Sequence, residues 1–248
     1  MGHDSGTGLP PSIEAAWGLR ERPTKGPKRG LSLDRIVAGA VRVAAAEGLP
    51  AVSMGRVAKE LGVSTMSLYR YVAAKDELLA LMADAAYGTP PEPRPDLGWR
   101  HELTRWAHEM RAALLDHPWA LRIPISGPPI TPHQLAWFER ALAALAGTRL
   151  GEGEKVSVVM LVSGHVKADA TLYAEFGAAL RAADSSPQDF MRSYGRTLSR
   201  LTDAERFPAL TAALAAGAVD KPDGPDDEFV FGLDRILDGI EVLMRDRA

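Results

Sequence analysis

Hydroxyl, aromatic and cationic side chains cluster in the stretch 53–71, SMGRVAKELGVSTMSLYRY. Side chains of these types bind phosphates and read base edges. The spacing predicts two short helices, because Ser53 and Ser64 stand at capping positions and Gly62 stands where a left-handed residue ends a helix. Apolar residues recur on one face of each helix and leave the polar residues pointing elsewhere. The stretch predicts a helix-turn-helix that binds DNA, with an ordinary helical hairpin as the alternative.

The flanking segments predict the elements that hold this motif in place. A supporting helix begins after Ser32, has a broad apolar face and stops at Gly48. A connector helix follows the motif, with Asp76 and Glu77 in its first turn. Residues 31–87 are therefore expected to form a three-helix DNA-binding domain with a connector helix.

The charge is divided unevenly along the chain, although the net charge is only −3. Residues 1–75 carry 11 Lys/Arg and 6 Asp/Glu, whereas the rest of the chain carries 18 and 26. This asymmetry indicates a basic module that meets phosphates and an acidic body that does not. Chance scatter in a nearly neutral protein is the alternative.

The run LSLDRIVAGAVRVAAAEGLPAVSMGRVAKELGVSTMSLYRYVAAKDELLALM resembles the N-terminal domain of TetR-family transcriptional repressors. It matches a helix ending in EG, then VSM, VAKELGVS, LYRYV and KDELL, at the family's spacing. The resemblance implies phosphate contacts from Tyr69 and Lys75, and base contacts from Thr65, Met66 and Arg70. We assign DNA contacts to Ser53, Arg56, Ser64, Thr65, Met66, Ser67, Tyr69, Arg70, Tyr71 and Lys75.

One position departs from the family pattern. Many members carry an arginine two residues after the Ser/Thr that caps the first helix of the motif, whereas this chain has Gly55 there and Arg56 next. The departure argues against base readout from that helix, and glycine weakens the helix by roughly 1 kcal/mol relative to alanine.

Residues 1–30 are rich in Gly, Pro and Ser and show no sustained hydrophobic period. This composition predicts a flexible arm and no packed element. The end of the arm is basic, with Arg20, Arg22, Lys25, Lys28 and Arg29 just before the supporting helix. Such an arm either follows a DNA groove or remains a solvated tail.

Residues 88–98 contain four prolines and mark a linker before a second helical domain at 99–248. Helical periods predict elements at about 99–117, 132–147, 152–183, from 187, 203–217 and from 226 onward. The helix order and the phrase ALLDHPWALRIPISGP resemble the tetracycline-repressor-type effector domain. That resemblance implies a homodimer whose four-helix bundle combines the long helix and the last helix of each subunit.

Four of the five tryptophans fall within residues 99–137, and the apolar segment 117–132 contains five prolines. Together they favour an apolar pocket for an aromatic or lipophilic small molecule, although such side chains more often form plain core. His165 is either a satisfied core residue or a polar contact in that pocket. The residues assigned to the effector are Trp106, Met110, Trp119, Ile125, Trp137, Met160 and His165.

Catalytic, cofactor and metal chemistry find no support in the sequence. The chain contains no cysteine, no phosphate-binding glycine motif, no nucleophile elbow and no pair of histidines four residues apart. It also lacks a long apolar run or a signal peptide, so a cytoplasmic location without a membrane partner is expected.

The sequence therefore predicts an all-α, homodimeric transcriptional regulator that binds a double-stranded, pseudo-palindromic operator. We interpret it as a repressor that an apolar or aromatic small molecule releases, with no enzymatic step. The alternatives are an activator or constitutive DNA binder of the same fold, or a helical small-molecule carrier or enzyme.

Overall fold

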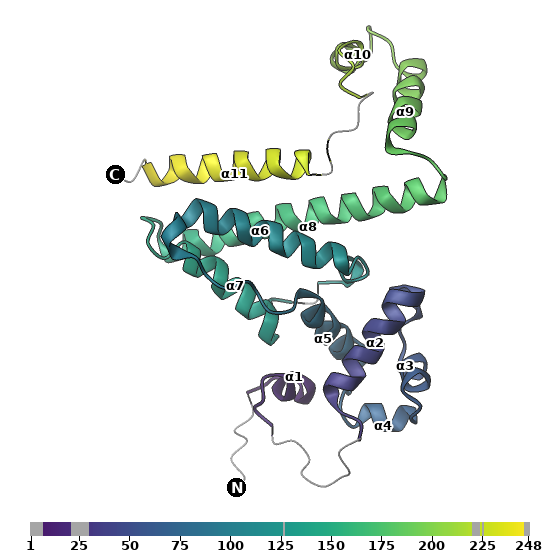
Figure 1. Cartoon of the computed structure of the whole chain (residues 1–248), viewed down its shortest axis with the longest axis vertical. Coiled ribbons are helices and arrows are strands. Elements are labelled where there is room, and N and C mark those ends of the chain that lie inside the picture. The colour runs from purple at the N-terminus through teal and green to yellow at the C-terminus, as the bar shows by residue number, and fades with distance from the viewer. Residues whose placement is uncertain (1–6, 21–29, 126, 220–223, 225, 246–248) are drawn as a thin grey trace.

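The computed structural model describes residues 7–20, 30–125, 127–219, 224 and 226–245 (Figure 1). The described residues form helices and loops without a β-strand, which confirms the all-α prediction. The longer helices are α2 (Leu33–Glu47), α3 (Met54–Leu61), α5 (Lys75–Tyr87), α6 (Gly98–Asp116), α7 (Pro132–Ala144), α8 (Glu152–Ala182), α9 (Pro187–Leu201), α10 (Pro208–Ala215) and α11 (Asp227–Arg245). The shorter elements are α1 (Pro11–Ala16), α4 (Thr65–Tyr69) and the 3₁₀ turns η1 (Leu49–Ala51), η2 (Pro95–Leu97) and η3 (Ala120–Arg122).

Helices α2 to α4 form the N-terminal module, and their ends follow the predicted caps. The hydroxyl oxygens of Ser32, Ser53 and Ser64 each accept a hydrogen bond from the backbone N–H three residues further on. Gly62 closes α3 in the left-handed conformation, at φ 68°. At Gly39 an added Cβ would lie 2.9 Å from Leu61 Cδ2, so the glycine allows α2 and α3 to pack closely.

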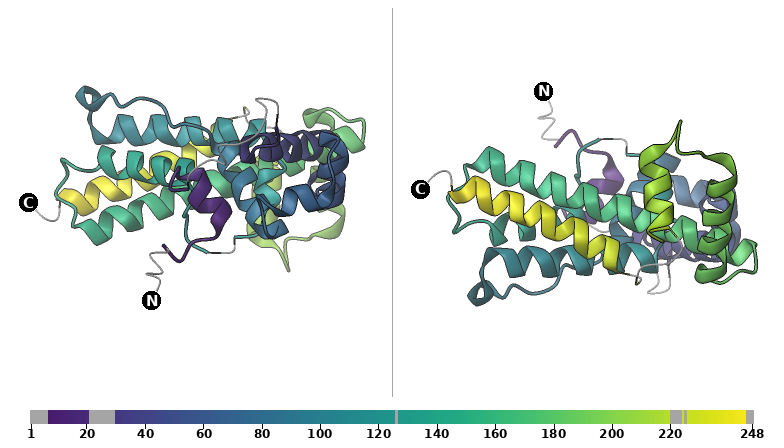
Figure 2. Two further views of the ribbon diagram at one scale, coloured as in Figure 1. Left: turned by 90° about the horizontal axis from the view of Figure 1, so that it is seen from below. Right: turned by 90° about the horizontal axis from the view of Figure 1, so that it is seen from above.

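Helices α6, α7, α8 and α11 form the C-terminal body, in which α8 packs against α6 and α11 (Figures 1 and 2). Helices α9 and α10 stand apart from this layer, at the end away from the C-terminus. The body and the N-terminal module each have their own apolar cluster. Helix α5 belongs to the N-terminal cluster and also contacts α6 and α7, so it connects the two parts.

The structure differs from the sequence-based expectation in two places. Residues 11–16 form the packed helix α1, where a flexible arm without a packed element was expected, because Ile13 is buried at 1% exposure against the N-terminal cluster. The basic residues Arg22, Lys25, Lys28 and Arg29 lie outside the described residues. Helix α4 ends at Tyr69, before Val72, although the expected apolar pair of Leu68 and Val72 is fully buried.

Candidate functional site

The short helix α4 presents three large side chains to solvent. Met66 is 73% exposed and Tyr69 46% exposed, and Arg70 is exposed at the C-cap. Leu68, on the opposite side, is fully buried and anchors the helix. Buried Leu68 therefore fixes the helix, while its exposed side carries an apolar, a phenolic and a cationic group. Groups of these types can contact base edges and phosphates.

The hydroxyl groups of the motif have local roles in the free protein. Ser64 Oγ accepts from Ser67 N at 3.3 Å and lies 2.9 Å from Ser67 Oγ. Ser53 Oγ accepts from Arg56 N at 3.1 Å, and Thr65 is half-buried. The contacts of Ser53 and Ser64 set the helix starts, and Ser53 Oγ keeps a second lone pair for a further contact.

Tyr71 is partly buried and holds the start of α2. Its Oη donates a hydrogen bond to the backbone oxygen of Leu31 at 2.8 Å. A DNA contact through this hydroxyl would have to share or replace that bond.

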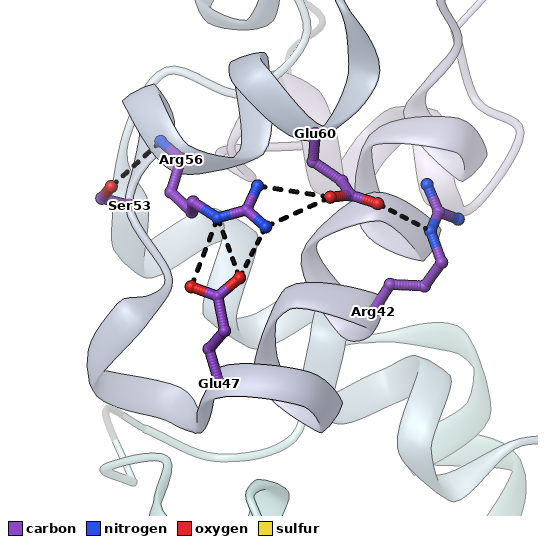
Figure 3. A network of polar contacts seen from close by, with 5 residues as sticks. All are labelled: Arg42, Glu47, Ser53, Arg56 and Glu60. Carbon is purple, nitrogen blue, oxygen red and sulfur yellow. Dashed lines mark hydrogen bonds and ion pairs between the residues drawn. The ribbon is translucent and has the colours of Figure 1, made fainter.

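Arg56 lies in a charged network that joins α3 to α2 (Figure 3). Its guanidinium donates to both carboxylate oxygens of Glu47, the shortest at 2.5 Å, and to Glu60 at 3.2 Å. Glu60 also accepts from Arg42 Nε at 3.2 Å. The hydrogen bond from Arg56 lowers the pKa of Glu47, and those from Arg42 and Arg56 lower the pKa of Glu60. Two arginines and two glutamates thus neutralise one another.

Arg70 and Lys75 differ from Arg42 and Arg56 in this respect. Both are exposed, and neither forms an ion pair with any residue that the structure describes. Lys75 is the first residue of α5, directly after the motif. These two cations are therefore available to phosphates or bases without the loss of an internal contact.

The residues assigned to an effector are divided among several places. Trp106 and Trp137 meet edge to face at 5.9 Å within the core of the body, beside Met110. All three are at most 5% exposed. Trp106 Nε1 donates to the backbone oxygen of Trp137 at 2.9 Å. This part of the prediction brings three neighbouring side chains together, packed against one another in the core.

The other predicted effector contacts lie elsewhere. Trp119 belongs to the N-terminal cluster, Ile125 is 82% exposed, and Met160 is 60% exposed on α8. His165 stacks on Phe229 at 5.3 Å and donates from Nε2 to the backbone oxygen of Phe229 at 2.9 Å. Residues 119–121 thus contact both parts of the molecule, since Trp119 packs on the N-terminal cluster and Leu121 on the cluster of the body.

A hollow of about 780 Å³ opens at the end of the body where α6 begins and α7 and α11 end. Its lining includes Trp99, Ala144, Arg149 and Met244, and none of the seven predicted effector residues. Its volume lies in the range of small-molecule sites.

Helices α5 and α7 each supply a side chain that hydrogen-bonds the free backbone groups at one end of the other helix. Asp84, which is 6% exposed on α5, accepts from the backbone N–H groups of His133 and Gln134 at 2.9 and 3.0 Å, and its second oxygen pairs with His133 Nδ1 at 2.9 Å. In return, Trp137 Nε1 donates to the backbone oxygens of Tyr87 and Gly88 at 3.1 and 3.0 Å. The connector and the body are therefore joined by hydrogen bonds at both helix ends.

Glu102 is the most strongly perturbed acid of the body. Burial raises its pKa, but the N–H of Arg94 and the guanidinium groups of Arg140 and Arg105 hydrogen-bond its carboxylate and lower the pKa to about 2. With 3% exposure, this carboxylate is a buried charge compensated from three sides.

Sequence reasoning missed Asp84 and Glu102 as organising residues. Each stands on a helix face whose apolar neighbours face the core, so an acidic residue at a core position was the available signal. Arg105 is three residues from Glu102 on the same helix, but the other partners, such as Arg94, Arg140 and Gln134, come from 8 to 50 residues away, which periodicity within one helix does not reveal.

The described residues contain no cluster of His, Cys, Asp and Glu that could hold a metal ion. None of the helices in this part of the chain is both long and apolar enough to cross a membrane.

The chain matches two family models. Residues 36–82 match bacterial regulatory proteins of the tetR family, and residues 91–244 match the tetracyclin repressor-like C-terminal domain. The HTH-type transcriptional repressor DrrR1 of Streptomyces coeruleorubidus is 40% identical over 248 residues, which cover 98% of this chain and 90% of DrrR1.

Solved structures agree with these matches. Apo ActR from Streptomyces coelicolor superimposes with a TM-score of 0.74 at 28% identity, covering 90% of this chain and all of ActR. ActR in complex with actinorhodin gives a TM-score of 0.70 at 30% identity, over 86% of this chain and 98% of that one. These matches confirm that the protein is a transcriptional regulator, as the sequence predicted, and the chain belongs to the TetR family of helix-turn-helix transcriptional regulators.

Proposed function

We propose that this regulator is a repressor that binds a pseudo-palindromic operator as a homodimer and is released by an apolar or aromatic small molecule. The observation that carries the DNA-binding site is the contrast between the exposed, unpaired cations Arg70 and Lys75 and the neutralised Arg42 and Arg56. Cations without internal partners lose little when they bind phosphates, because no ion pair has to break.

The homodimer is supported by apolar side chains that α8 and α11 leave in water. An apolar or small residue recurs every fourth position of α8 from Val156 to Leu172, including Met160, with Val156, Met160 and Leu172 between 40% and 71% exposed. On α11, Phe231 is 62% exposed and Val242 49% exposed. Helices α8 and α11 pack on each other, so these exposed groups lie on adjoining helices, and a two-fold axis would pair this surface with its copy.

The nature of the effector is supported by the relative ActR, which is solved with actinorhodin bound. The body of the present chain offers aromatic and apolar side chains for a similar compound, whether near the packed Trp106 and Trp137 or in the hollow beside Trp99.

DNA binding is tested with duplexes enriched by the purified protein from a randomised pool. We expect Arg70→Gln and Lys75→Gln each to weaken binding about tenfold and to lower the salt slope by about 1. Arg200→Gln on α9, an exposed arginine without an ion pair among the described residues, is the matched control and should bind as the wild type does. If the wild type enriches no duplex, or the three variants bind alike, this site is wrong.

The dimer is tested by light scattering, with Met160→Asp combined with Leu172→Asp. The charges should give a monomer, whereas Ile125→Asp, an exposed apolar position outside α8 and α11, should remain dimeric. A monomeric wild type would exclude the proposed assembly.

Release is tested by adding actinorhodin to the protein–duplex complex, with magnesium–tetracycline as the comparison compound. If neither compound releases the duplex, the alternative of a constitutive binder is favoured.

A further inference from the structure

We propose that the N-terminal segment 7–20, which precedes both matched family domains, acts as a clasp that fixes the angle between the DNA-binding module and the body. Ser12 and Trp17 are its positioning residues. The inference goes beyond the proposed function, because it concerns how the motif is aimed.

The first contact of the clasp is with the DNA-binding module. Ile13 is 1% exposed and packs with residues of α2 and α5, and Ser12 is fully buried. Ser12 Oγ donates to Glu77 Oε2 at 2.6 Å, and the same oxygen accepts from Ala73 N at 3.2 Å. One carboxylate of α5 therefore joins α1 to the turn that follows α4, the second helix of the helix-turn-helix and its proposed recognition helix, close to Lys75.

The second contact is with the body. Trp17 Nε1 donates to the backbone oxygen of Ile130 at 2.8 Å. Ile130 is two residues before α7, whose first N–H groups are bound by Asp84 of α5. The clasp thus bridges the module and the segment that leads into α7, next to the place where α5 and α7 already meet.

The clasp has the internal structure needed to transmit a restraint. A six-residue helix is marginal by itself, but this one ends in a Schellman motif, with Gly18 at φ 69° and bonds from Gly18 N to Ala15 and from Leu19 N to Glu14. Glu14 also accepts from Thr7 Oγ1 and from Arg20 Nε, both at 2.8 Å. Residues on both sides of α1 are therefore tied to its middle.

The restraint matters for binding because two rigidly aimed recognition helices lose less freedom on an operator than two loosely aimed ones. Without the bonds from Ser12 and Trp17, the module would remain attached through α5 and the contacts of Trp119, but with a wider range of angles.

The range of angles between the DNA-binding module and the body can be measured as a distribution of distances between two spin labels. The chain has no cysteine, so spin labels at Lys59→Cys on α3 and His101→Cys on α6, both exposed positions, report the distance from the module to the body. The labelled chain is diluted with unlabelled chain so that one labelled chain is observed at a time. We expect Ser12→Ala combined with Trp17→Phe to broaden the distance distribution by about half and to weaken binding of the enriched duplex about fivefold.

Ser193→Ala, an exposed serine on α9 and outside the proposed dimer surface, is the matched control and should change neither measurement. Circular dichroism of the double variant checks that the fold is intact, and Ile13→Asp provides a stronger disruption of the same contact. An unchanged distance distribution in the double variant would overturn the clasp. If the wild type enriches no duplex, the proposed function fails, while the distance measurement still decides the inference.

Discussion

The network around Arg56 in the N-terminal module and the network around Glu102 in the C-terminal body differ in how far water reaches them. In the module, Arg42, Glu60, Arg56 and Glu47 form a chain along the surface between α2 and α3. In the body, Glu102 is 3% exposed and is enclosed by arginine side chains. Water screens the first network, whereas the second would leave uncompensated buried charge if one partner were lost. The network around Arg56 therefore mainly positions side chains, whereas the network around Glu102 stabilises the fold.

The largest expected effect follows from removing the buried charge. Glu102→Gln leaves Arg140 and Arg105 without their carboxylate and should lower the free energy of unfolding by about 3 kcal/mol. Urea denaturation followed by circular dichroism measures this change. The comparison fails if Glu102→Gln is no more destabilising than Glu60→Gln in the surface network.

Acid should have a graded effect through the same residue. The pKa of Glu102 is about 2 in the folded protein, against an ordinary value of 4.5. A depressed pKa contributes stability that is fully present above the unfolded value and is lost as the pH falls toward the folded value. The free energy of unfolding should therefore fall between about pH 4.5 and about pH 2 more steeply in the wild type than in Glu102→Gln. Parallel curves for the two proteins would contradict this assignment.

The smallest effect is expected in the surface network. Arg56→Gln should change the affinity for the enriched duplex by less than about threefold, because Glu47 and Glu60 already hold this guanidinium and exposed pairs contribute little. Titrating the enriched duplex with Arg56→Gln and with Arg70→Gln under the same conditions measures how a paired and an unpaired arginine differ. An equal loss in both variants would show that Arg56 leaves its network to bind DNA.

The ends of the module's helices could be predicted from the sequence, whereas the contacts of the site residues with other helices could not. Caps such as Ser53 and Ser64 and the glycine after α3 are local signals, and each lies where a single helix end requires it. The ion pair of Arg56 with Glu47 was not predictable in this way, because Glu47 belongs to another helix and is brought close only by the packing of α2 on α3.

The same limit applies to the body and to α1. Trp119 was predicted from composition to face an effector, but its place in the N-terminal cluster depends on the packing of the neighbouring turn η3 on α5. Proline at N1 and Gly18 at the end did mark α1, yet a six-residue helix has too short a period to be recognised without its partner surface.

Because Asp84 and Trp137 form hydrogen bonds in both directions between α5 and α7, these two helices should move together as a rigid unit. Helix α5 contains 13 residues and is about 20 Å long. A tilt of about 5° at its Tyr87 end would displace Lys75 by nearly 2 Å over that length. Hydrogen bonds have donor–acceptor distances up to about 3.2 Å, so a rotation of this size in the body would carry the ammonium group away from the phosphate that we propose it binds.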